Sequence, residues 1–187
     1  DSASFALVVF YKRVAFFPVG LDLQLLPLAD ESKPQASKIL LSVALRHISG
    51  GGLIEVINTH FGMEEEEKRK SVEFLSGYLS QRRGEFLCAG DFNFFDDRDG
   101  KLHRDVMLQK GGVDDLAYPL SNASGTFMGY RHDAFHQPFE SMSRLDHIFA
   151  PYSVTKVGEG YVFGDMERVK DRTYSSDHLM IVANVQF

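Results

Sequence analysis

Two short groups of polar residues carry the residue types that hydrolyse phosphoesters. Asp91 and Asn93 are two positions apart and follow the apolar run 86–88. In an extended segment such positions face the same way, so both side chains would reach one substrate atom. Near the other end of the chain, Asp177 and His178 stand side by side before a second apolar run, 179–185. An acid next to an amide and an acid next to an imidazole are residue types that metal-assisted phosphoester hydrolysis requires.

Two further groups have a similar composition. The triplet Asn58-Thr59-His60 closes one apolar stretch, and Arg144-Leu145-Asp146-His147 leads into another. Each group alone also has an ordinary structural explanation. Gly-Asp-Phe-Asn is typical of a turn in which Asp and Asn side chains bond the local backbone, and Ser-Asp-His is compatible with a surface loop. Their joint occurrence at strand ends favours a polar site on a rigid scaffold.

The hydrophobic pattern predicts the strands that must position these groups. A continuous apolar run indicates a buried strand over residues 5–11. Alternation over 38–47, a triple-glycine turn at 50–52 and a return run over 53–59 predict a hairpin. Further strands are expected over 86–89, 145–150, 155–163 and 179–186.

Helices are expected on either side of the 86–89 strand. The first covers residues 63–80, where four glutamates favour the N-terminal end of the helix dipole. Val72, Leu75 and Leu79 then form a core stripe at helical spacing. A second, short helix is expected over 104–109. The fold class is therefore mixed α/β, and its sheet cannot be purely parallel because hairpins make antiparallel pairs.

Composition narrows the function classes. With 187 residues the chain is most simply one domain, residues 1–187. Its net charge of −6, with scattered basic residues, argues against tight nonspecific binding of duplex DNA. No apolar run has the length of a transmembrane segment. The single cysteine, Cys88, lies in an apolar run and is expected to be a buried, unreactive thiol.

Taken in chain order, four stretches resemble motifs of the endonuclease/exonuclease/phosphatase superfamily, which includes DNase I-like nucleases. They are Ile57-Asn58-Thr59-His60-Phe61, Ala89-Gly90-Asp91-Phe92-Asn93, Ser143-Arg144-Leu145-Asp146-His147-Ile148-Phe149 and Ser175-Ser176-Asp177-His178. The resemblance implies a four-layer α/β sandwich with two mixed, largely antiparallel β-sheets. It also implies a phosphodiesterase, nuclease or phosphatase activity.

The resemblance assigns roles to matching residues. It implies that Asp91 orients or deprotonates the attacking water and that Asn93 holds the scissile phosphate. His178 would contact the phosphate, and Asp146 would fix and polarise that imidazole. His60 matches a histidine that contacts phosphate or assists the leaving group. Hydrolysis of a phosphoester needs these same functions, which are an oriented nucleophile, charge stabilisation and help for the leaving oxygen.

The family also uses a divalent metal, and here the sequence departs from its pattern. Mg²⁺, with Mn²⁺ as a possible substitute, would be held by Asp177 and Asp91. The family's early Asn and its main metal ligand, a Glu in a Gln-Glu pair, have no match, so the chain resembles the C-terminal portion of the domain. We therefore expect a separate N-terminal segment of the same domain as a possible partner, and weak Mg²⁺ binding and little hydrolysis by these 187 residues alone.

Substrate and secondary roles stay open at this level. The expected substrate is a phosphoester in a nucleic acid, a nucleotide or a phospholipid headgroup, and residues 128–139 are the best candidates to contact it. Thr126 matches a threonine often found before the Asp146 motif, and packing explains it equally well. Arg144 either reaches phosphate or pairs with an acid. The alternative function is a catalytically impaired interaction module on the same fold.

Overall fold

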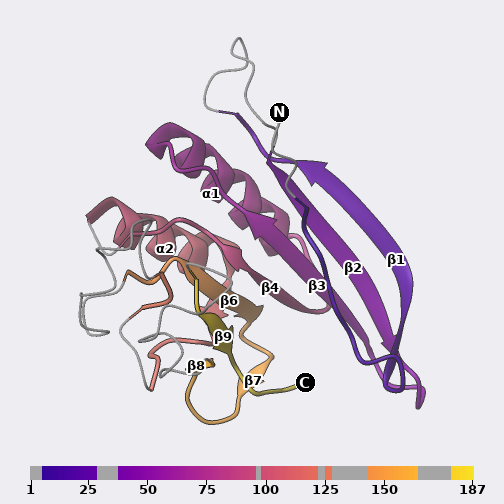
Figure 1. Ribbon diagram of the computed structural model, residues 1–187. Coiled ribbons are helices and arrows are strands. Elements are labelled where there is room, and N and C mark those ends of the chain that lie inside the picture. Colours follow the sequence, from indigo (N-terminus) through magenta and orange to yellow (C-terminus); the bar gives the residue numbers. More distant parts are fainter. Residues whose placement is uncertain (1–5, 29–37, 96–97, 122–124, 128–142, 164–177) are drawn as a thin grey trace.

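A computed structural model describes residues 6–28, 38–95, 98–121, 125–127, 143–163 and 178–187 (Figure 1). Its helices are α1 (Glu65–Ser80) and α2 (Arg98–Gly111). Its strands are β1 (Phe16–Leu25), β2 (Ile39–His47), β3 (Leu53–His60), β4 (Glu85–Asp91), β5 (Val113–Asp115), β6 (Asp146–Pro151), β7 (Thr155–Lys156), β8 (Tyr161–Phe163), β9 (Met180–Val182) and β10 (Val185–Gln186).

Six strands form one mixed sheet in the order β1-β2-β3-β4-β6-β5. The predicted hairpin is confirmed, because β2 and β3 pair antiparallel across the glycine turn. β3 and β4 pair in parallel, and α1 makes the crossover between them. The remaining neighbours in this sheet are antiparallel, as the sequence requires of a mixed α/β fold.

Both helices lie along one face of the sheet and close the main core (Figure 1). Val72, Leu75 and Leu79 are buried in that core, as their helical spacing predicts. Cys88 is also fully buried there, as expected. Strand side chains alternate between faces. A smaller cluster around Ala150 therefore uses the opposite face, where Ala183 and Val185 of the C-terminal segment pack against it.

The strand expected over residues 5–11 is wrong for the described residues 6–11, which have no strand assignment. Leu7, Val9 and Tyr11 instead pack across the face of β2, against a cluster of its apolar residues. Leu7, Val9 and Tyr11 are thus half-buried by packing and not by a hydrogen-bonded ladder, whereas Val8 and Phe10 are exposed. β1 follows it and tolerates Pro18 because the strand lies at the sheet edge and is bulged there.

β1 leaves an apolar row uncovered. Leu21, Leu23 and Leu25 have 70%, 56% and 68% of their surface exposed. In the β1–β2 register, Leu21 lies opposite Val43 and Leu23 opposite Leu41, so the row continues the apolar face of β2. Within the part of the chain that the structure describes, this end of the sheet therefore carries both the outer edge of β1 and an apolar face.

Other element boundaries also differ from expectation. The helix predicted over 104–109 begins at Arg98, because exposed polar residues such as Lys101 extend it beyond its apolar stripe. The strand expected over 155–163 is divided into β7 and β8, and that over 179–186 into β9 and β10. Neither helix of the described residues has the length and apolar character needed to span a membrane.

Candidate active site

Three of the expected site residues form a row across adjacent strands. Asp91, the last residue of β4, pairs with His60 at the end of β3 and with Asp146 at the start of β6. Residues directly opposite one another in a sheet share a face, so the three side chains meet. The His60 Nε2 atom lies 3.3 Å from the Asp91 Oδ2 atom. The sequence separates these residues by up to 86 positions, and the sheet register brings them together.

His178 completes the group from the far end of the chain. Its Nδ1 atom is 2.8 Å from Asp146 Oδ2, and its Nε2 atom is 3.7 Å from Asp91 Oδ2. The hydrogen bond to Asp146 places a proton on Nδ1 and fixes the ring orientation. The side chains of the four residues are between 17% and 39% exposed, so a substrate can reach them.

The pKa values of Asp91 and His60 are shifted toward each other. Burial raises the pKa of Asp91, a hydrogen bond from the Asn93 backbone lowers it, and the neighbouring Asp146 carboxylate raises it further; the net direction is upward. Burial lowers the pKa of His60 despite the opposing charge of Asp91. A carboxyl group with a raised pKa next to histidines is suited to general acid–base catalysis.

The backbone around Asp91 explains the neighbouring motif residues. A Cβ atom on Gly90 would lie 2.0 Å from the Thr59 carbonyl oxygen, so only glycine allows β3 and β4 to approach here. Asn93 has a left-handed φ of 53°, which asparagine tolerates better than most residues. Its backbone N–H donates to Asp91 Oδ1 at 2.9 Å. The structure therefore shows the local turn, and the catalytic role of the motif stays a prediction.

The side chain of Asn93 faces inward. It is 2% exposed, and its Nδ2 atom donates to the Phe61 carbonyl oxygen at 2.9 Å. In this conformation Asn93 fixes the chain that follows Asp91. Its expected contact with a substrate phosphate stays a prediction.

Lys68 of α1 is a site neighbour that motif reasoning missed. Its side chain is 7% exposed, and its Nζ atom lies 3.1 Å from Glu65 Oε2 and donates to the Asn93 carbonyl oxygen at 3.4 Å. A signal was available, because Lys68 lies one helical turn before Val72 on the predicted core stripe. A lysine at such a position points into the protein.

Arg144 and His147 belong to a different group. Arg144 pairs with Asp115 through Nη2 and Oδ1 at 2.6 Å, which decides the open alternative in favour of an acid partner. His147 Nδ1 lies 2.8 Å from Asp115 Oδ2. His147 is buried on β6, on the opposite face from its neighbour Asp146. Burial would raise the pKa of Asp115, but its contacts with His147 and Arg144 outweigh this and lower it to about 2.

Only one of the two expected Mg²⁺ ligands, Asp91, is among the described residues. Among them, no group of three or more His, Cys, Asp or Glu side chains is arranged to hold a metal ion. The Asp91 carboxylate accepts a hydrogen bond from the Asn93 backbone and lies next to the His60 imidazole, and the Asp146 carboxylate is bonded to the His178 imidazole. The expected ligand Asp177 and the expected substrate contacts 128–139 lie outside the described residues.

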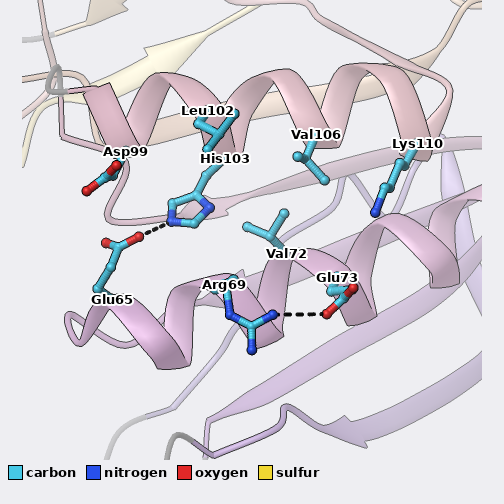
Figure 2. Close-up of a pocket in the computed structure, with 9 residues that line it drawn as sticks. All are labelled: Glu65, Arg69, Val72, Glu73, Asp99, Leu102, His103, Val106 and Lys110. Carbon is cyan, nitrogen blue, oxygen red and sulfur yellow. Dashed lines mark hydrogen bonds and ion pairs between the residues drawn. The ribbon is translucent and has the colours of Figure 1, made fainter.

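A separate pocket of about 340 Å³ opens between α1 and α2 (Figure 2). Its floor is apolar, and its charged rim is largely paired, with Glu65 contacting His103 and Arg69 contacting Glu73. None of the four grouped residues lines it. The pocket is therefore distinct from the candidate active site.

Solved structures of other proteins share the fold of this chain. An endonuclease/exonuclease/phosphatase protein from Bacteroides vulgatus superposes with a TM-score of 0.70 at 18% identity, over 94% of this chain and 68% of its own. This chain has the endonuclease/exonuclease/phosphatase fold. The fold implied by the motifs is thereby confirmed. The chain spans about two thirds of that structure, which is consistent with the expectation of a partial domain.

Solved structures of differently named proteins share this endonuclease/exonuclease/phosphatase fold. A mannosyl-6-phosphatase from Bacteroides thetaiotaomicron matches with a TM-score of 0.67 at 17% identity, over 95% of this chain and 69% of its own. TDP2 from D. rerio, in complex with a single-strand DNA product, matches with a TM-score of 0.69 at 17% identity, over 92% and 69%. No protein-family model and no curated protein sequence matches the chain.

Proposed function

We propose that this chain carries the catalytic residues of a phosphoester hydrolase. The observation that carries the proposal is the convergence of His60, Asp91, Asp146 and His178 at one edge of the sheet, with a carboxylate-bound imidazole facing a second carboxylate. Structures that share the fold include a phosphatase and a protein holding a DNA product, which supports the same chemical class.

In the proposed reaction, Asp91 is the general base. Its raised pKa suits it to accept a proton from water as the water oxygen bonds to phosphorus and the bond to the leaving oxygen breaks. His178, held by Asp146 through Nδ1, presents Nε2 to a phosphoryl oxygen and stabilises its developing charge. His60, 3.3 Å from Asp91, is placed to donate a hydrogen bond to the leaving oxygen.

A divalent cation is part of the proposal. We propose Mg²⁺, with Mn²⁺ as a substitute, bound by Asp177 and Asp91. A bound cation would offset the carboxylate charge that Asp91 and Asp146 bring together and would neutralise charge on the phosphoryl group. Mg²⁺ demands near-octahedral oxygen coordination, so further ligands beyond these two carboxylates are required.

The substrate is proposed only as a class. Nucleic acid, nucleotide, phospholipid headgroup and sugar phosphate all present a phosphoester that this group of side chains fits. The fold does not choose among them, because specificity depends on loops around the site.

The proposal is tested by hydrolysis of a phosphoester panel by the protein with its expected N-terminal segment, because little hydrolysis is expected of these 187 residues alone. The panel contains p-nitrophenyl phosphate, bis-p-nitrophenyl phosphate, a single-stranded oligonucleotide, a phosphoinositide and mannose 6-phosphate, each with Mg²⁺, Mn²⁺ or a chelator. Asp91→Asn should reduce kcat at least about 100-fold, as expected for loss of a general base. Chelation should have a comparable effect.

Asp105→Asn is the matched control, because Asp105 is an exposed carboxylate on α2 and lies outside the site. It should leave activity unchanged. Activity that survives both chelation and Asp91→Asn would overturn the proposed mechanism. Binding of a panel member without turnover would instead indicate the interaction module.

A further inference from the structure

Thr126 holds the start of β6 through its side chain. It is fully buried, and its Oγ1 atom accepts hydrogen bonds from the backbone N–H groups of Leu145 and Asp146, both at 3.1 Å. One hydroxyl oxygen therefore binds two successive amides at the position where Asp146 enters the site. A hydroxyl has two acceptor lone pairs, so this arrangement uses its full accepting capacity.

The backbone of the same residue holds the chain that carries His178. The Leu179 N–H donates to the Thr126 carbonyl oxygen at 2.7 Å, and Phe127 forms a β-bridge with His178. The Phe127 ring also packs on the His178 imidazole, with ring centroids 5.1 Å apart. The two partners of the Asp146–His178 hydrogen bond are 32 residues apart in sequence, and the short segment 125–127 contacts the backbone beside each of them.

We propose that Thr126 is a positioning residue for the Asp146–His178 pair. This inference rests on the proposed function only for its effect on catalysis. The Thr126 hydroxyl fixes the Asp146 backbone, and its carbonyl fixes the residue after His178, so the 2.8 Å bond between the two side chains depends on both. The consequence is a fixed direction for His178 Nε2, the atom that would face the phosphoryl group.

The chemistry of the variants separates this role from simple packing. Valine has nearly the shape of threonine but offers no acceptor, so Thr126→Val leaves the Leu145 and Asp146 amides without their oxygen. Thr126→Ser keeps the oxygen and removes a methyl group. If packing is the only role, the valine variant should resemble the parent and the serine variant should be the perturbed one. If the hydroxyl positions Asp146, only the valine variant should perturb His178.

The direct readout is the imidazole of His178 measured by ¹⁵N NMR, assigned with His178→Gln. In the parent chain the Nδ1–H tautomer should dominate. Thr126→Val should mix the two tautomers, because a displaced Asp146 carboxylate no longer holds the proton on Nδ1. Thr126→Ser should retain the parent spectrum. Ser76→Ala removes a buried hydroxyl from α1 and is the control, with no expected effect on His178.

Kinetics give the second readout. Thr126→Val should lower kcat at least about 10-fold while KM changes less than about twofold, since misplacing a catalytic group costs turnover more than binding. Thr126→Ser should restore kcat. If Thr126→Val does not fold by circular dichroism, Thr126→Ala, which also removes the acceptor oxygen of the two amides, takes its place.

The outcomes distinguish the two proposals. If the protein with its expected N-terminal segment shows no turnover and the His178 spectrum still responds to Thr126→Val, the proposed function is overturned and the positioning role is kept. A His178 spectrum that is unchanged in the folded valine or alanine variant overturns the positioning role, whether or not the chain hydrolyses phosphoesters. Equal effects of the valine and serine variants overturn it as well.

Discussion

Replacing Asp115 by Asn should destabilise the protein strongly without touching the candidate active site. The Asp115 carboxylate is 6% exposed and receives Arg144 at 2.6 Å and His147 at 2.8 Å. Asparagine has nearly the same shape but only one acceptor oxygen, and its NH₂ group would face one of the two donors. The change leaves the buried guanidinium without this countercharge.

The magnitude follows from two independent routes. The pKa of Asp115 falls from an ordinary 3.8 to about 2, which at about 1.4 kcal/mol per unit corresponds to about 2.5 kcal/mol favouring the ionised carboxylate in the fold. Removing one partner of a buried ion pair typically costs about 3–5 kcal/mol, because the remaining charge stays buried. We therefore expect a loss of about 3 kcal/mol. For a domain of this size the loss lowers Tm by roughly 10 °C.

Thermal unfolding followed by circular dichroism measures this loss at neutral pH. The acid dependence provides a second measurement. Because the folded pKa of Asp115 lies below its unfolded value, its contribution is complete above about pH 4 and is lost as pH falls toward 2. The parent should lose this stability over that range, and Asp115→Asn should not. The control is Asp114→Asn, at the neighbouring exposed position. A variant whose Tm matches that of the control at neutral pH would refute this account of the buried group.

Three further changes test other features of the fold. Gly90→Ala forces a Cβ against the Thr59 carbonyl and should cost at least about 3 kcal/mol in urea unfolding, or prevent folding; an unchanged midpoint would contradict the close approach. Gly77→Ala, in open space within α1, should instead stabilise by about 0.5–1 kcal/mol in the same assay. Leu23→Lys on the exposed row of β1 should reduce self-association, measured by light scattering, with little change in Tm. If the variant and the parent scatter equally, the row does not mediate self-association.

The sequence pattern predicted those elements whose structure depends on residues close together in the chain. The 38–59 hairpin and the core stripe of α1 depend on a glycine turn and on helical spacing, and both are confirmed. β1 was missed because Pro18 and a bulge interrupt its alternation, whereas residues 6–11 have the apolar character of a strand without its pairing.

The candidate site was predictable as a set of residues but not as a geometry. The motifs identified His60, Asp91, Asp146 and His178, and the sheet register then brings them together. The inward direction of the Asn93 side chain depends on a left-handed backbone and on the Phe61 carbonyl, which no motif reports. Arg144 looked like a phosphate ligand as readily as an ion-pair partner, because its partner Asp115 lies 29 residues away.

The burial of the chain's only cysteine gives the active-site strand a chemical reporter. Cys88 lies in β4 between Ile57 and Phe149 of the neighbouring strands, three residues before Asp91. Burial raises the pKa of its thiol, so a thiol reagent cannot react with it while the strand is paired. The ratio of its alkylation rate to that of a free thiol therefore measures how often β4 separates from its neighbours, at one position and without any substrate.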